Sequence, residues 1–133
     1  MQTDNPDNAA TAEARKWLRR TLDHAAREIS ERGILEDPLI EVKPDWMLPF
    51  ALLVGRARGQ GEARSFKWFI CGEVTLDTLD GAMADSARNA IRSFAMKWQL
   101  DAERATSSEE SERLIKAAEQ LYPLAEDDRL WQQ

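Results

Sequence analysis

The chain has 133 residues, of which 43% are hydrophobic and 32% are charged. A chain of this length and composition can bury one core of its own, so one globular domain is expected. The formal net charge of −6 argues against nucleic acid or an anionic membrane as a partner, because affinity for either depends on positive charge.

The first part of the chain predicts a tail followed by a long helix. Residues 1–8 are polar and contain Pro6, which indicates a disordered tail. From residue 9 to residue 32, apolar side chains recur three and four positions apart, as in an amphipathic helix. Gly33 stands where a left-handed residue would end that helix.

The middle of the chain predicts three strands. The first covers residues 39–42 between Pro38 and Pro44, the second covers 46–58, and the third covers 65–74. Glycines at 59 and 61 supply a turn, so the last two strands should form an antiparallel hairpin. Pro49 removes a backbone donor and indicates a bulge or an edge position. Apolar residues line both faces of this hairpin, so one face should pack on helices and the other should be partly covered, with a second subunit as one way to cover it.

The last part predicts a loop and two helices. A loop over residues 75–81 precedes a helix over 83–105, and a third helix follows Ser107. Ser107 with Glu110 has the spacing of a capping box, and Pro123 should kink or end the helix. The predicted fold is therefore a single α+β domain over residues 9–133. It has a three-stranded, mostly antiparallel sheet packed against three helices, in the order α-β-β-β-α-α.

Four segments give the chain a family resemblance. They are Lys67-Trp68-Phe69-Ile70-Cys71-Gly72-Glu73; Ala87-Arg88-Asn89-Ala90-Ile91-Arg92-Ser93-Phe94 with Trp98-Gln99-Leu100-Asp101-Ala102-Glu103; Ala118-Glu119-Gln120-Leu121-Tyr122; and Leu130-Trp131. With these segments, the chain resembles a family of small uncharacterised bacterial proteins grouped as a domain of unknown function, which has a Trp-Gln-Leu helix motif. The resemblance supports the order of the elements and implies no activity.

The residue types that carry most enzyme chemistry are scarce. His24 is the only histidine and Cys71 the only cysteine, whereas a nucleophile–base pair or a structural zinc site needs several such groups placed together. Asp77, Asp80 and Asp85 surround a glycine, but their spacing does not match a calcium loop, and turn or helix-cap chemistry explains them. We therefore predict no catalytic residues, no metal and no cofactor.

Arginines surround the predicted hairpin turn. Arg56, Arg58 and Arg64, with Lys67 nearby, could bind carboxylates of a partner protein, because a guanidinium offers paired donors. Arg56 and Arg58 are two positions apart and should share one face of their strand. The same residues also suit an ordinary solvated tip with charges that protect an edge.

A second group of polar residues suggests an alternative site. Arg88, Arg92 and Gln99 fall on one stripe beside the apolar stripe of the second helix, and Glu73 and Asp77 lie in or near the preceding loop. Such groups can line a ligand pocket, but they can equally bond a neighbouring element. If the five side chains converge on one concave site, they would support small-ligand binding or an unfamiliar hydrolytic activity.

The sequence thus favours a non-enzymatic protein that binds another protein, of the adaptor, immunity or inhibitor type. A homodimer built on the outer hairpin face is compatible with this hypothesis and with the ligand-binding alternative. The lone cysteine fits a reducing compartment, and neither a signal peptide nor a membrane-length apolar run is visible. We therefore expect a cytoplasmic protein.

Overall fold

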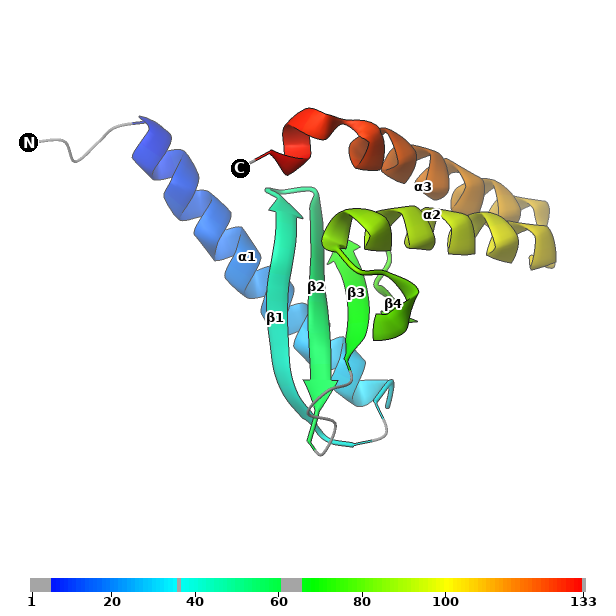
Figure 1. Cartoon of the computed structure of the whole chain (residues 1–133), viewed down its shortest axis with the longest axis horizontal. Helices are drawn as coiled ribbons and strands as arrows, with labels where there is room; N and C mark the ends of the chain where they lie inside the picture. Colours follow the sequence, from blue (N-terminus) through cyan, green and yellow to red (C-terminus); the bar gives the residue numbers. More distant parts are fainter. Residues whose placement is uncertain (1–5, 36, 61–65, 133) are drawn as a thin grey trace, which may run out of the picture. The chain divides into compact units, whose positions relative to one another are not determined.

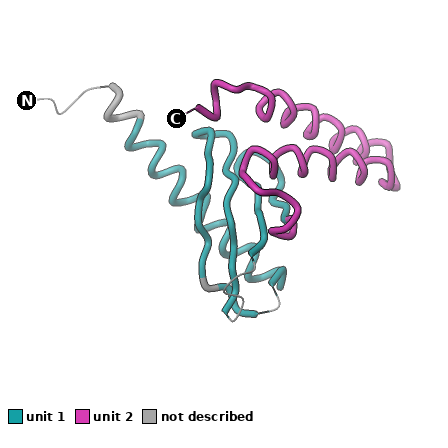
Figure 2. The backbone as a smooth tube through the Cα atoms, in the orientation of Figure 1, with its two compact units in different colours: residues 1–78 teal, residues 79–133 magenta. Residues whose placement is uncertain are grey.

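The computed structural model describes residues 6–35, 37–60 and 66–132. Its elements in chain order are α1 (Pro6–Glu31), β1 (Leu39–Leu48), β2 (Leu52–Gly59), β3 (Lys67–Gly72), β4 (Asp77–Asp80), the 3-10 helix η1 (Gly81–Met83), α2 (Ala87–Arg104), α3 (Ser108–Glu126) and the 3-10 helix η2 (Asp128–Trp131). Figure 1 shows these elements, and Figure 2 shows that the chain divides into two compact units, residues 1–78 and 79–133. The prediction that 9–133 form one domain stays a prediction.

The first unit is built on α1, which packs on β1, β2 and β3 (Figure 1). The helix begins at Pro6, inside the stretch expected to be a disordered tail, while residues 1–5 of that stretch lie outside the described residues. Its core face carries Ala25 and Ile29, which are 0% and 1% exposed. The predicted helix end is confirmed, because Gly33 adopts a φ of 62° just after it.

The sheet has four strands in the order β1-β2-β3-β4, and its pairs β1–β2 and β2–β3 are antiparallel. The α+β class is confirmed, but the prediction of three strands is wrong, and the order is α-β-β-β-β-α-α. The additional strand β4 lies in the segment 75–81 that was expected to be a loop. The segment Asp77-Thr78-Leu79-Asp80 contains one apolar residue, so it shows no alternation of apolar and polar side chains.

The strand predicted over residues 46–58 is in fact divided by a turn. The Ala51 amide donates to the Leu48 carbonyl across 3.0 Å, and Phe50 between them has a φ of 67°. Residues 46–48 therefore complete β1, and Pro49 lies in the turn rather than at a bulge. This turn has Pro at its second position and a positive φ at its third, as in a type II turn, where glycine is usual at the third position.

Pro44 lies inside β1, although it was expected to end a strand at residue 42. An edge strand tolerates proline because the missing donor leaves no partner strand unsatisfied, and β1 is the outer strand next to β2. The register between Pro44 and Trp46 shifts by one residue against β2. Asp45 is therefore the additional residue of a β-bulge, which changes the direction of its side chain.

The hairpin of β2 and β3 confirms the predicted antiparallel pair, although Gly61 of its turn lies outside the described residues. Both hairpin faces carry buried residues. Leu53 and Phe69 belong to the core cluster that includes Ala25 and Ile29 of α1. On the opposite face, Val54 is aligned with Ile70, and both are 0% exposed.

The second unit contains α2 and α3, which lie antiparallel side by side (Figure 1). Helix α2 begins at Ala87 rather than at residue 83, because Ser86 caps it by accepting a hydrogen bond from the Asn89 amide. Ser107 caps α3 in the same way at 3.2 Å from the Glu110 amide, as predicted. Pro123 does not end α3, which continues to Glu126. Burial of Leu121 and Ala125 on its inner face offsets the backbone hydrogen bond that the proline removes.

Candidate functional site

Arg56 on β2 is held by three groups on its side of the sheet. Its Nη2 donates to Oδ1 of Asp45 at 2.8 Å, and its guanidinium carbon lies 5.5 Å from the Phe66 ring centre and 5.7 Å from that of Trp68. The two rings pack edge to face at 5.3 Å. Each cation–π contact at such a site contributes on the order of 0.5–1 kcal/mol, so the side chain has few other positions of similar energy.

The sheet register explains this arrangement. Arg56 is aligned with Trp68 on β3 and with Lys43 on β1, and aligned residues point to the same face of a sheet. Asp45 approaches from the β1 bulge. Although three groups hold Arg56, 44% of its side chain is exposed, so this guanidinium is both fixed and accessible.

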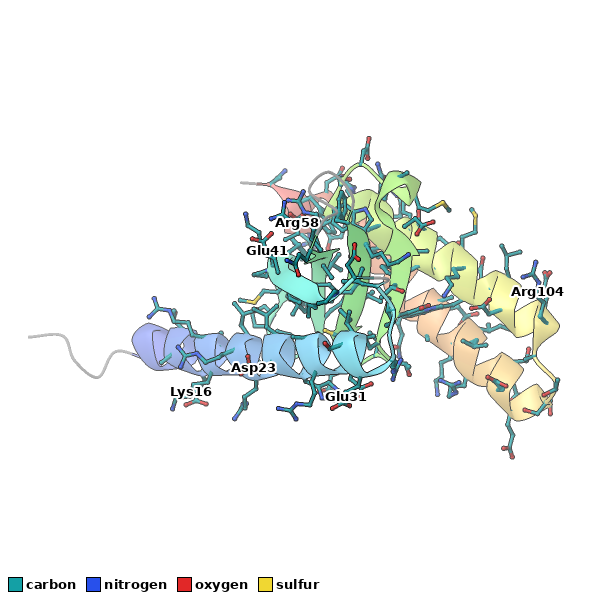
Figure 3. All side chains as sticks on the ribbon, turned by 90° about the horizontal axis from the view of Figure 1, so that it is seen from below. Lys16, Asp23, Glu31, Glu41, Arg58 and Arg104 are labelled. Carbon is teal, nitrogen blue, oxygen red and sulfur yellow. The ribbon has the colours of Figure 1, made fainter. Side chains whose placement is uncertain are left out.

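Arg58 lies on the same face as Arg56, as their spacing predicted. Arg58 is aligned with Glu41 on β1, and its Nη2 lies 3.5 Å from Oε1 of Glu41. Figure 3 shows these two side chains at the surface beside β1. Lys67 is aligned with Ala57 instead and therefore lies on the opposite face, and Arg64 lies outside the described residues.

Lys43 belongs to this surface, although the sequence did not indicate it. It is exposed and directly opposite Arg56 across the β1–β2 pair. We call Glu41, Lys43, Asp45, Arg56 and Arg58 the arginine face. It carries three cations and two carboxylates, whereas the whole chain has a net charge of −6, so it is a local site of positive charge.

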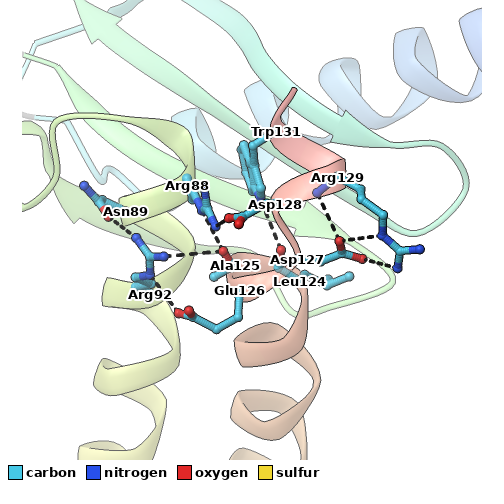
Figure 4. Close-up of polar contacts among 10 residues, drawn as sticks. All are labelled: Arg88, Asn89, Arg92, Leu124, Ala125, Glu126, Asp127, Asp128, Arg129 and Trp131. Carbon is cyan, nitrogen blue, oxygen red and sulfur yellow. Dashed lines mark hydrogen bonds and ion pairs between the residues drawn. The ribbon is translucent and has the colours of Figure 1, made fainter. Parts of the chain in front are cut away.

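In the second group of predicted site residues, Arg88 and Arg92 bond to residues of the same unit at the end of α3 (Figure 4). Arg88 donates through Nε to the Ala125 carbonyl at 2.7 Å and through Nη2 to Oδ1 of Asp128 at 2.5 Å. Arg92 donates to Oε1 of Glu126 at 3.0 Å and to Oδ1 of Asn89 at 2.6 Å. Arg92 also reaches the Ala125 carbonyl at 3.5 Å. Both arginines of α2 thus bond the C-terminal end of α3, where carbonyls lack helical partners and cations are favoured.

The segment after α3 completes this network. Trp131 of η2 donates through Nε1 to the Leu124 carbonyl at 3.0 Å, and its ring centre lies 6.0 Å from the Arg88 guanidinium carbon. Asp127 accepts two hydrogen bonds from the side chain of Arg129, which hold the pKa of its carboxyl below the usual range. Together these contacts form a network that joins α2, α3 and η2.

The remaining predicted ligand-site residues have local partners. Gln99 accepts a hydrogen bond from the Tyr122 hydroxyl at 3.1 Å, farther along α2 than Arg88 and Arg92. Asp77 accepts one from the Thr78 amide at 2.8 Å, and the amide of Glu73 donates to the Ala51 carbonyl. Glu73 and Asp77 belong to the first unit and the other three to the second, so the convergence of all five stays a prediction.

The remaining candidate groups among the described residues are a small pocket, His24 and Cys71. A pocket of about 240 Å³ has Ser30 and Asp37 as its polar lining residues, and it is smaller than most ligand pockets. His24 lies 3.9 Å from Glu28 on the exposed side of α1, and Cys71 is buried. Within residues 6–35, 37–60 and 66–132, no three His, Cys, Asp or Glu side chains are placed to hold a metal ion.

The fold and this site define a small α+β protein with an antiparallel sheet and a fixed, partly exposed arginine on its second strand. The chain belongs to the family described as a domain of unknown function, DUF4826, whose match covers residues 11–131. No curated protein and no solved structure shows significant similarity to the chain. Among the described helices, none has the length and apolar composition needed to span a membrane.

Proposed function

We propose that the chain is a non-enzymatic protein-binding module, of the adaptor, immunity or inhibitor kind, which contacts its partner through the arginine face. One observation carries this proposal: Arg56 is held by Asp45, Phe66 and Trp68, yet 44% of its side chain is exposed. Arginine is enriched among the residues that dominate binding energy at protein interfaces.

The energetic argument concerns the order of the side chain before binding. Fixing a long side chain at an interface costs on the order of 0.5–1.5 kcal/mol. Asp45 and the two rings already restrict Arg56 in the free protein, so a partner that contacts it meets a smaller cost. The planar guanidinium can then donate to a carboxylate or a backbone carbonyl of the partner.

The alternative, a small-ligand site or a hydrolase using Glu73, Asp77, Arg88, Arg92 and Gln99, stays a prediction. The hydrogen bonds of Arg88 and Arg92 to the end of α3 favour a structural role for these two residues. A homodimer and a cytoplasmic location also stay expectations, the second supported by the single cysteine.

The test is a comparison of matched variants in an affinity pull-down from the native host, with sizing chromatography of the recovered complex. Arg56→Ala should lose the partner, whereas Arg104→Ala, which removes an exposed arginine at the end of α2, should retain it. A partner recovered equally by both variants, or no partner at all with the unmodified chain, would contradict the proposal.

A further inference from the structure

Resting on the proposed function, we infer that the arginine face recognises an extended acidic segment of the partner, and that Lys43 is a specificity-determining residue for it. The carboxylates of that segment would alternate along the chain, so that they lie on one side. Lys43 with Arg56 would receive one carboxylate, and Arg58 would lie beside the next.

The charge pattern of the face carries this inference. Lys43 and Arg56 are directly opposite each other on adjacent strands, and like charges in that position destabilise a sheet. Asp45 balances Arg56 and Glu41 balances Arg58. In the part of the chain that the structure describes, no carboxylate forms an ion pair with Lys43. An incoming carboxylate between Lys43 and Arg56 would remove the repulsion that the free protein contains.

The spacing of the cations defines the shape of the partner. Arg56 and Arg58 are two residues apart on one strand, which separates their Cα atoms by roughly 7 Å. Carboxylates at every second position of an extended segment repeat at the same distance and point to the same side. Phe66, which is half-buried beside Arg56, offers an apolar contact next to the cations.

A charge reversal at Lys43 separates recognition from stability. Lys43→Glu places a carboxylate opposite Arg56, so it should retain the fold and raise the melting temperature slightly. The same change should repel an acidic partner. A variant that merely damaged the sheet would lower both stability and binding, so the two readouts together identify a role in recognition.

The experiment measures fluorescence anisotropy with a fluorescein-labelled peptide that alternates aspartate with threonine, and with the same peptide carrying asparagine for aspartate. The aspartate peptide should bind the unmodified chain at least about tenfold more tightly than the asparagine peptide, and its affinity should fall as salt is added. Lys43→Glu should weaken it about tenfold, Lys43→Ala about threefold, and Arg56→Lys about fivefold. Lys116→Glu, the same change on the exposed side of α3, should alter affinity less than twofold.

Several results would overturn the inference. They are equal binding of the two peptides, no binding of the aspartate peptide, an equal effect of Lys116→Glu, tighter binding of a short oligothymidylate, and self-association that Lys43→Glu abolishes. The pull-down keeps the two proposals distinct. A native partner lost with Arg56→Ala but retained with Lys43→Glu would leave the proposed function standing and refute the acidic-segment inference.

Discussion

Gly55 of β2 lies directly opposite Phe69 of β3, and the Phe69 ring occupies the space that a side chain on Gly55 would need. A Cβ added to Gly55 would lie 2.4 Å from the Lys43 carbonyl oxygen and 2.6 Å from Cζ of Phe69. Phe69 is 0% exposed, so it cannot move without disturbing the core against α1. The missing side chain of Gly55 therefore lets the Phe69 ring pack directly over the backbone of β2.

Gly55→Ala should destabilise the protein by about 3 kcal/mol, since overpacking against both backbone and a buried ring forces both to shift. Urea denaturation followed by circular dichroism measures this loss. Gly33→Ala is the control: a Cβ there meets no atom within 4 Å, and the only cost comes from its φ of 62°, about 1 kcal/mol. If the two substitutions cost the same, the close contact at Gly55 is not what stabilises the sheet.

The turn between β1 and β2 holds Phe50 in a conformation that suits glycine. Its φ is 67°, and its half-exposed ring packs against Trp17 of α1 at 6.2 Å. Phe50→Gly relieves the backbone cost of about 1 kcal/mol and loses a ring contact of similar size, so its stability should change by less than about 1 kcal/mol.

Phe50→Val tests the backbone term separately. A β-branched residue is disfavoured at positive φ, so this variant should be about 2 kcal/mol less stable than Phe50→Gly. Thermal unfolding of both variants gives the difference. If the two variants are equally stable, the positive φ at residue 50 does not contribute to the free energy of unfolding.

The turn and the strand that the sequence did not predict in this sheet both lack a local signal. Helical periodicity and the Ser107–Glu110 spacing are local signals, and they located α1, α2 and the start of α3. The turn at Pro49–Phe50 lacks the glycine or asparagine that a positive φ usually requires, so the apolar run from 46 to 58 suggested one strand. Strand β4 has Leu79 as its one apolar residue, so it carries no periodic signal.

The site shows the same division between local and non-local information. The two-residue period of a strand was sufficient to place Arg56 and Arg58 on one face. Lys43 and Asp45 were missed because their positions depend on cross-strand register and on a bulge, neither of which a single strand reveals. Pro44 was the available signal, since a proline within a β-rich stretch often marks an edge strand or a bulge.

The network that joins α2, α3 and η2 depends on Arg88, whose side chain is 27% exposed. Arg88→Ala leaves the Ala125 carbonyl with only the longer bond from Arg92. It also removes the ion pair with Asp128 and the cation–π contact with Trp131, so the protein should lose about 2 kcal/mol of stability. Hydrogen exchange of the Leu130 amide, which donates to the Asp127 carbonyl, should accelerate more than exchange within α2.

Arg129→Ala is the control for this prediction. The Arg129 side chain is 87% exposed and pairs with Asp127, and ion pairs between exposed side chains contribute little to stability. Its removal should therefore leave the exchange rates of α2 and α3 unchanged. Equal effects of the two substitutions would refute the role of Arg88 as the residue that joins the helices to η2.

Burial raises the pKa of the Cys71 thiol from 9.0 to about 12, because a thiolate on β3 would lie in the apolar core. Below pH 9 the thiol is protonated in both the folded and the unfolded chain, so its titration does not lower the free energy of unfolding there. Between pH 9 and about 12, the unfolded chain releases the proton while the folded chain retains it. The free energy of unfolding should then fall by up to about 1.4 kcal/mol per pH unit from this group.

Urea denaturation at pH 8 and pH 10.5 measures this slope, and Cys71→Ala corrects for lysine and tyrosine titration. The alanine variant should start less stable but lose less stability as pH rises, and identical slopes would mean that the thiol is not protected in the folded state.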